Sequence, residues 1–310
     1  MPVKSPGQIT VSMNFDDNNS LPPNFAASTG LPEAFEPQAT PAPSSAHEFQ
    51  APPARLLPED LRVPWGWADI LLLVVVASFG IVVCGMLIVT VLSFFGVTRA
   101  HIQKSPAEWN LITVFAQILL DLGLLGYLAA QIRLRFGAPF WRTIGWRPLE
   151  ARPGSHGAAY FGFILGGLFL GFMVSLVGAI FPPKGPLPIQ KVLEDPRTLM
   201  VFMLTAVLVA PVVEETIFRG YLYPVVARSL GVGGGIAVTG TLFGLLHAMQ
   251  LWGGWWQVAM LVVVGIVLTS ARAATRTVAA SYMLHLGYNL YQVIGYLIAV
   301  NFQHGLHRVH

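Results

Sequence analysis

Charged residues are scarce in this sequence. They make up 11% of it, whereas about 25% is usual for a soluble domain. Hydrophobic residues make up 54%, and the mean hydropathy is +0.62. So few charges exclude an ordinary soluble globular domain, because such a domain needs a polar surface. The composition instead predicts a protein that is embedded in a lipid bilayer.

The sequence also lacks a pair of cysteines, a basic stripe with exposed aromatic residues and the pattern of a signal peptide. The sequence has a single cysteine, Cys84, which excludes an internal disulfide and is best interpreted as a small packing residue. No basic stripe accompanies exposed aromatic residues, so we expect no nucleic-acid binding. No positively charged start leads into an apolar core near Met1, so we expect no cleavable signal peptide.

Residues 1–62 lack a sustained apolar periodicity. They are rich in Pro, Ala, Ser and Asn and carry seven acidic residues against three basic ones. Such a segment cannot bury enough apolar surface to offset the entropy lost on ordering. We therefore predict a disordered tail over 1–62 and a transmembrane helical domain over 63–310.

Long apolar runs fill the rest of the chain. Each is close to the ~20 residues that a helix needs to cross a bilayer. The runs span about 69–95, 109–131, 157–181, 199–227, 233–250, 255–271 and 277–301. They predict an all-α fold, a polytopic bundle of about seven transmembrane helices, with eight as the alternative.

Basic residues gather in alternate loops between these runs. They follow the second, fourth and sixth runs: Arg133, Arg135, Arg142, Arg147, Arg152, Arg228, Arg272 and Arg276. Loops rich in Lys and Arg face the cytoplasm, so this pattern predicts a cytoplasmic N-terminus. We expect a multi-pass integral membrane protein, in the plasma membrane if the source is prokaryotic.

The fourth run contains two adjacent acids and an arginine. A charged side chain at the centre of a membrane helix costs about 2.5–3.5 kcal/mol on insertion scales. Glu215 and Arg219 are four residues apart and share a helix face, which predicts a structural ion pair. Glu214 is rotated by about 100° from Glu215 and is therefore left for chemistry. Pro211, just upstream, is expected to loosen the helix.

Two later runs contain histidines. His247 follows Phe243 by four residues, and His285 precedes Asn289 by four, so each pair shares a helix face. A lone histidine in a helix would be interpreted as a packing residue. Two histidines, an amide and a spare acid in three membrane segments indicate a reaction site instead.

These groups suit the attack of water on a peptide bond. A carboxylate in a cavity of low dielectric constant is a good general base for water, and a neighbouring histidine can position or deprotonate that water. A second histidine and an asparagine amide can donate hydrogen bonds to a developing oxyanion. No Ser or Cys stands out as a nucleophile beside a base, so activated water is favoured.

A metal site is the main alternative within the enzyme class. Glu214, His247 and His285 could form a His₂Glu zinc site. The sequence contains no H-E-x-x-H helix, and the three ligands would come from different helices. Spacing cannot decide between the two mechanisms. We favour a glutamate mechanism without a cofactor, with zinc as the alternative.

The three motifs together resemble the CAAX protease and bacteriocin-processing family of intramembrane glutamic endopeptidases. The family signatures EExxxR, FxxxH and HxxxN match EETIFR at 214–219, FGLLH at 243–247 and HLGYN at 285–289. They occur in the family's order, and the resemblance covers about 199–301, the protease-like core. A single motif is weak, but all three in consecutive apolar segments are fairly specific.

The resemblance implies roles for four residues. Glu214 and His247 would activate water, and His285 and Asn289 would stabilise the oxyanion. The implied substrate is a membrane-associated peptide or protein, of the prenylated CaaX type in eukaryotic relatives. Family members have been described both as metalloproteases and as glutamate-dependent enzymes, so zinc stays open.

Two other functional classes remain as alternatives. A proton-coupled transporter also places carboxylates and histidines in membrane helices, although the inverted repeats typical of transporters are not visible here. Asp69 and Asp121 could then belong to a proton relay. A catalytically silent bacteriocin-immunity or scaffold protein could also keep the motifs without turnover.

Overall fold

The structure is a computed structural model that describes residues 58–97, 105–149 and 155–307. Over these ranges the regular secondary structure consists of helices alone. The predicted all-α class is therefore confirmed. Most of the predicted N-terminal tail, residues 1–57, lies outside the described residues.

The end of the predicted tail belongs to the folded part. Residues 58–62 include a short 3₁₀ helix, η1 (Glu59–Leu61), and the Leu61 side chain is buried. Asp60 forms an ion pair with Arg272, so the folded part begins before residue 63, where we predicted it. Local composition misled the prediction here, because the contacts that order this segment come from distant helices.

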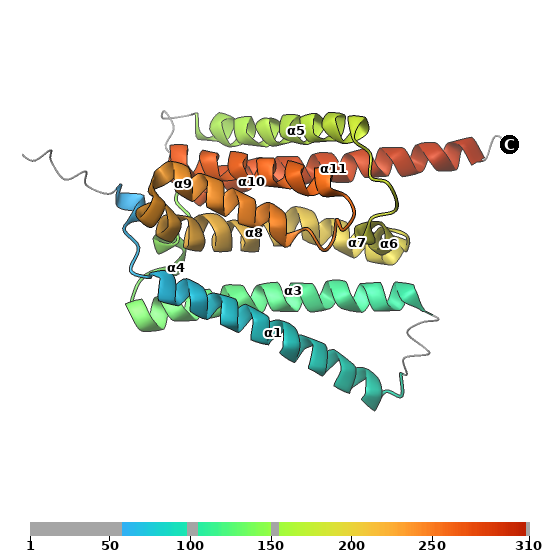
Figure 1. Ribbon diagram of the computed structural model, residues 1–310, viewed down its shortest axis with the longest axis horizontal. Helices are drawn as coiled ribbons and strands as arrows, with labels where there is room; N and C mark the ends of the chain where they lie inside the picture. The colour runs from blue at the N-terminus through green and yellow to red at the C-terminus, as the bar shows by residue number, and fades with distance from the viewer. Residues whose placement is uncertain (1–57, 98–104, 150–154, 308–310) are drawn as a thin grey trace, which may run out of the picture. The chain divides into compact units, whose positions relative to one another are not determined.

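The first and second apolar runs form long helices. They are α1 (Trp67–Phe94) and α3 (Pro106–Ala130), and α3 continues into the π-helical segment η2 (Gln131–Arg135). The short helix α4 (Phe140–Thr143) follows and contains Trp141 and Arg142 of the basic loop. In Figure 1, α1 and α3 carry the blue-to-green colours of this part of the chain.

The remaining runs are helical as well. Their helices are α5 (His156–Ile180), α6 (Pro188–Leu193), α7 (Pro196–Leu204), α9 (Tyr223–Leu246), α10 (Trp255–Thr275) and α11 (Val278–His307). Asp195 caps the N-terminus of α7 by accepting a hydrogen bond from the Thr198 amide. This bond and a second one from the Thr198 hydroxyl lower the pKa of the Asp195 carboxyl.

The helix that carries the two acids is irregular on both sides of them. The π-helical segments η3 (Thr205–Val209) and η4 (Thr216–Leu222) flank the short helix α8 (Ala210–Glu215). Pro211 lacks an amide hydrogen and crowds the carbonyl four residues earlier, so the preceding turn widens. Such π-helical turns occur frequently at functional sites.

The chain reverses direction at Gly231. This residue has φ +74°, a left-handed conformation that glycine adopts without strain, and it interrupts α9. A Cβ atom built on Gly235 would lie 2.7 Å from the Ala227 Cβ atom, although eight residues of straight helix span about 12 Å. The two halves of α9 therefore pack against each other as a hairpin, with the fourth predicted run ending before Gly231 and the fifth beginning after it.

Within the residues that the structure describes, five helical stretches are long and apolar enough to cross a membrane. They are Trp67–Phe94, Pro106–Arg135, Gly157–Ile180, Pro196–Leu246 and Trp255–Thr275. The fourth stretch contains the Gly231 reversal. Helix α11 covers the seventh predicted run but is not among the five, so the number of crossings stays a prediction. The chain is an integral membrane protein with several apolar helices.

Glycines allow the helices of the C-terminal half to approach closely. A Cβ atom on Gly167 of α5 would lie 2.0 Å from the Leu284 carbonyl oxygen of α11. A Cβ atom on Gly240 of α9 would lie 2.5 Å from the Ile266 nitrogen of α10. Small residues at such crossings are typical of helix packing in lipid. They bring α5, α9, α10 and α11 together around the motif residues.

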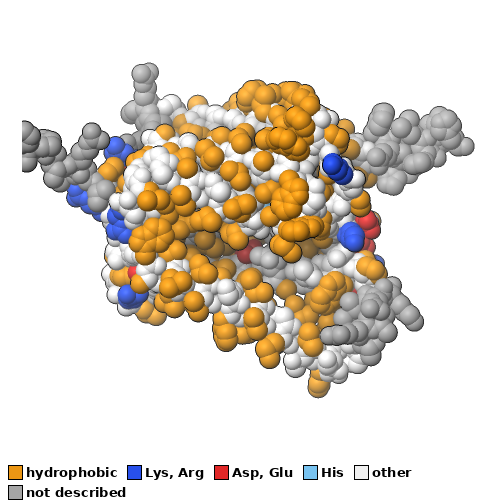
Figure 2. Space-filling view, in the orientation of Figure 1, with side chains coloured by type: hydrophobic (Ala, Val, Ile, Leu, Met, Phe, Trp, Pro, Cys, Tyr) orange, Lys and Arg blue, Asp and Glu red, His pale blue; other side chains and the backbone are white. Residues whose placement is uncertain are grey.

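The molecular surface agrees with a membrane setting. Figure 2 shows hydrophobic side chains over the sides of the helices and Lys and Arg side chains towards their ends. Large exposed apolar residues include Leu71, Phe79, Met86, Phe169 and Ile298. Exposed apolar surface of this extent on a soluble protein would cause association, whereas lipid tails can cover it.

Candidate functional site

The Glu215–Arg219 ion pair that the spacing predicts is present in the structure. The Arg219 Nη1 atom lies 2.9 Å from the Glu215 Oε1 atom, and both side chains are 0% exposed. Arg219 also donates from Nη2 to the Gly265 carbonyl at 3.0 Å and from Nε to the Thr269 hydroxyl at 3.2 Å. A buried pair of this kind needs such additional hydrogen bonds to offset its desolvation.

An aromatic ring completes the environment of Arg219. The guanidinium carbon lies 4.5 Å from the centroid of the Phe243 ring, which is cation–π geometry. Phe243 thus has a second role beside its place in the FxxxH motif. It joins α9 to Arg219 on η4, and Phe218 packs against it edge to face with ring centroids 5.3 Å apart.

His285 connects the two adjacent acids. Its Nδ1 atom lies 2.9 Å from the Glu215 Oε1 atom, and its Nε2 atom lies 3.7 Å from the Glu214 Oε2 atom. An ionised carboxylate can only accept a hydrogen bond, so Nδ1 carries a hydrogen and donates to Glu215. Glu215 therefore holds a histidine as well as an arginine, which the sequence did not indicate.

Glu214 differs from its neighbour in accessibility. Its side chain is 28% exposed, whereas that of Glu215 is fully buried. The 100° rotation between consecutive helix residues accounts for this difference. Of the two acids, Glu214 is the one that a water molecule or a substrate can reach.

His247 lies at the end of the second half of α9. Its Nδ1 atom is 2.8 Å from the Phe243 carbonyl oxygen, so Nδ1 donates and Nε2 is left as an acceptor. The His247 ring lies 4.9 Å from the Phe243 ring, and the His285 ring lies 5.6 Å from it. Phe243 therefore contacts both histidines.

Asn289 lies one turn beyond His285 on α11. Its amide nitrogen donates to the Ala206 carbonyl oxygen at 2.7 Å, within the π-helical segment η3. An asparagine amide has two hydrogens, so the second stays available to another acceptor. The irregular backbone of η3 thus supplies a carbonyl group that fixes the position of this side chain.

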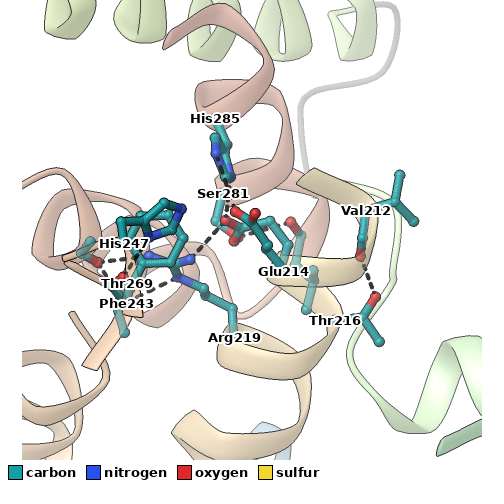
Figure 3. Close-up of polar contacts among 12 residues, drawn as sticks. Val212, Glu214, Thr216, Arg219, Phe243, His247, Thr269, Ser281 and His285 are labelled. Carbon is teal, nitrogen blue, oxygen red and sulfur yellow. Dashed lines mark hydrogen bonds and ion pairs between the residues drawn. The ribbon is translucent and has the colours of Figure 1, made fainter. Parts of the chain in front are cut away.

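The motif residues converge from separate elements, as Figure 3 shows for Glu214, Arg219, Phe243, His247 and His285. The structure places Glu214 beside His285. No hydrogen bond or ion pair joins Glu214 to His247 within the described ranges, so the predicted pairing of these two residues stays a prediction. Thr269 and the Gly265 carbonyl were missed, because they lie about fifty residues from Arg219 and belong to no motif.

A second polar network supports η4 from the other side. The Tyr221 hydroxyl donates to Gln131 at 2.7 Å, and Gln131 donates to Asp69 at 3.2 Å. Arg135 forms an ion pair with the same Asp69 carboxylate. This network joins α1, η2 and η4, so Asp69 has a packing role.

The candidate zinc ligands do not assemble. No three His, Cys, Asp or Glu side chains lie close enough together to hold a metal ion in the part of the chain that the structure describes. His285 directs Nδ1 to Glu215, and only its Nε2 atom faces Glu214. The choice between a zinc site at Glu214, His247 and His285 and a glutamate mechanism without a cofactor stays a prediction.

Comparison with known proteins supports the motif assignment. Residues 196–291 match the family described as type II CAAX prenyl endopeptidase Rce1-like. Neither the curated proteins nor the solved structures give a match to this chain. The matched segment contains α7 to α10 and the first half of α11, with all three motifs. The resemblance to the CAAX protease and bacteriocin-processing family is thus confirmed over residues 196–291, the segment that matches the Rce1-like family.

Proposed function

We propose that this protein is an intramembrane endopeptidase that uses a glutamate-activated water molecule. The observation that carries the proposal is the contact between Glu214 and His285, with an Nε2–Oε2 distance of 3.7 Å. It places an accessible carboxylate beside an oriented imidazole, inside a membrane helix bundle. The Rce1-like match of the same segment supports hydrolysis of a peptide bond.

Glu214 acts as the general base in this proposal. Its carboxylate removes a proton from water while the water oxygen attacks the carbonyl carbon of the peptide. The protonated Glu214 then returns the proton to the leaving amine. General acid–base catalysis by a positioned side chain typically contributes about 10²–10⁴-fold to the rate.

His285 and Asn289 stabilise the oxyanion. Glu215 holds the His285 Nδ1 atom, so a doubly protonated ring can donate from Nε2 to the substrate oxygen. The second amide hydrogen of Asn289 is the other donor. His247, whose Nε2 atom is an acceptor, assists Glu214 in orienting the water.

Glu215 and Arg219 support this site without reacting. Their ion pair is completely buried, so neither group is accessible to substrate. Their function is to orient His285 and to make η4 stable in lipid. The chemistry proposed here relies on protein groups alone and needs no metal.

The substrate class follows from the family and the setting. Glu214 lies within a helical stretch that is apolar enough to span a membrane, so the substrate must be held at the membrane. We propose a membrane-associated peptide or protein of the CaaX type, cleaved from the cytoplasmic side. The lipid bilayer and this substrate are the expected partners.

Peptide fragments from cells carrying the wild type and Glu214→Gln test this function. Fragments present only with the wild type would identify both the activity and its substrate. Glu194→Gln, an exposed position before α7, is the matched control and should leave the fragments unchanged. Identical fragments from the wild type and Glu214→Gln would contradict the proposal. Loss of cleavage with a chelator would contradict only its metal-free form.

A further inference from the structure

A charged pocket lies away from the Glu214 site. Its volume is about 320 Å³, at the lower end of the ~300–1,000 Å³ typical of small-molecule sites. Residues from η1, α4, the loop after α4 and the end of α10 line it. Its charged lining residues are Glu59, Asp60, Arg62, Arg142, Arg147 and Arg272.

The pocket has an excess of positive charge. Four arginines face two acids, and only one acid is strongly engaged. Asp60 forms an ion pair with Arg272 at 2.8 Å, with both side chains buried. Glu59 lies 3.8 Å from Arg147, but its side chain is 83% exposed, so solvent screens this pair. The lining therefore suits an anionic ligand.

Two arginines in this lining have a buried Nε donor that is unused. The Nε atoms of Arg147 and Arg272 are buried and have no hydrogen-bond partner among the residues that the structure describes. Arg272 is 1% exposed, and its guanidinium group packs beside Gly145, where a Cβ atom would lie 3.3 Å from Nη2. Buried donors of this kind need an acceptor. Both residues line the pocket, so an anion bound there would lie beside these donors.

The surroundings of the pocket favour a lipid headgroup. Trp67, at the start of α1, and Trp141, beside Arg142 on α4, are 52% and 47% exposed. Exposed tryptophans at helix ends are typical of the membrane–water interface, where phospholipid phosphates lie. The basic loops of this end are those that the sequence assigns to the cytoplasmic side, which carries the anionic lipids.

We propose that this pocket binds a phosphate group, supplied by the headgroup of an anionic phospholipid. Arg142 and Arg147 contact the phosphate from α4 and the loop that follows it, and Arg272 contacts it from α10. Guanidinium groups pair with phosphate through charge-assisted and often bidentate hydrogen bonds.

Binding would join elements that are far apart in the chain. Asp60 of η1 is already bound to Arg272, so a phosphate on Arg272, Arg142 and Arg147 would link η1, α4 and α10. Arg272 lies three residues after Thr269, whose hydroxyl accepts from Arg219. An occupied pocket therefore stabilises the end of the helix that supports the candidate active site.

Thermal unfolding of the full chain, purified in lipid-depleted detergent and phosphate-free buffer, tests the proposal. Dioctanoyl phosphatidylglycerol should raise the unfolding midpoint by several degrees, because a ligand that binds only the folded state stabilises it. Dioctanoyl glycerol has the same chains without the phosphate and should not. In Arg142→Gln/Arg147→Gln, the phosphatidylglycerol concentration giving half of the shift should rise about tenfold or more, since charge-assisted hydrogen bonds are lost.

The matched control is Arg133→Gln/Arg276→Gln, which removes two exposed arginines outside the pocket. It should respond to phosphatidylglycerol as the wild type does. Equal responses of the two double variants would overturn the proposal, and so would an equal shift with dioctanoyl glycerol. Inorganic phosphate, compared with chloride at the same ionic strength, distinguishes the sources. If inorganic phosphate raises the unfolding midpoint and this effect is lost only in Arg142→Gln/Arg147→Gln, the pocket is a site for free phosphate. If only phosphatidylglycerol raises the midpoint, the pocket is a site for a lipid headgroup.

Discussion

Two buried arginines in this protein are paired with acids at nearly equal distances, yet their surroundings differ. Arg219 lies 2.9 Å from Glu215, and Arg272 lies 2.8 Å from Asp60. Every nitrogen of Arg219 has an acceptor, namely Glu215, the Gly265 carbonyl and Thr269. Arg272 lines a pocket, and its Nε atom has no partner within the described ranges.

The two arginines therefore have different roles, one in supporting the fold and the other in binding a ligand. Arg219 is fully buried and each of its nitrogens is hydrogen-bonded inside the bundle, so it serves to fix η4 and, through Glu215, His285. A guanidinium group with an unused buried donor beside a charged pocket can still bind an anion. The same residue type thus supports a candidate reaction centre at one place and forms a candidate anion site at another.

Breaking the satisfied pair should have the largest effect. Glu215→Ala leaves Arg219 charged and unpaired in the bundle, which costs about 3–5 kcal/mol in the free energy of unfolding. We expect a strong loss of folded protein, measured by yield and thermal unfolding in detergent. Glu214→Ala, at the neighbouring and partly exposed position, is the control. Equal stability of the two variants would mean that the Glu215 pair does not support the fold.

Breaking the second pair should cost less. In Asp60→Asn, Arg272 loses its carboxylate partner but can still reach water through the pocket. We therefore expect the free energy of unfolding to fall by about 1–3 kcal/mol. Chemical denaturation of the purified full chain measures this loss. A cost as large as that of Glu215→Ala would show that the pocket does not hydrate Arg272.

Removing one acceptor of Arg219, so that its Nε atom is unpartnered like that of Arg272, should lower the free energy of unfolding by still less. Thr269→Val keeps the shape of the side chain but removes the acceptor of the Arg219 Nε atom, which is worth about 0.5–1.5 kcal/mol. Thermal unfolding would measure it. Ser270→Ala, at the next position of α10, is the control, because its hydroxyl bonds only within its own helix. If the two variants were equally stable, the Nε contact would contribute nothing.

The exposed partner in the pocket should matter least. Glu59→Gln removes a contact between side chains that are 83% and 40% exposed, so we expect a change of at most about 1 kcal/mol in the free energy of unfolding. The change should shrink further at high salt, because salt screens exposed charges. A large loss that persists at high salt would indicate that Glu59 is an essential part of the pocket.

The two pairs also show what the sequence could predict. Glu215 and Arg219 are four residues apart on one helix, so helical geometry alone indicates their contact. Asp60 and Arg272 are 212 residues apart, and Asp60 lies in a segment whose composition resembles a disordered tail. No local pattern reports a contact that only the packing of distant helices creates.

The same reasoning applies to the candidate site. Apolar runs and motif spacing predicted the helices and the facing side chains, since both depend on period and length. The contact of His285 with Glu215, the π-helical segments around α8 and the hairpin at Gly231 depend on tertiary packing. The interruption by Pro211 was visible in the sequence, but its form, a wide turn on either side of the acids, was not.

The most direct test of this account measures cleavage and stability together in Glu214→Gln. The substrate is the peptide identified from the fragments of wild-type cells. We predict a cleavage rate at least about 100-fold lower, because the general base is lost, with an unfolding midpoint close to that of the wild type. A variant that folds normally and cleaves at the wild-type rate would contradict the assignment of Glu214 as the reacting acid.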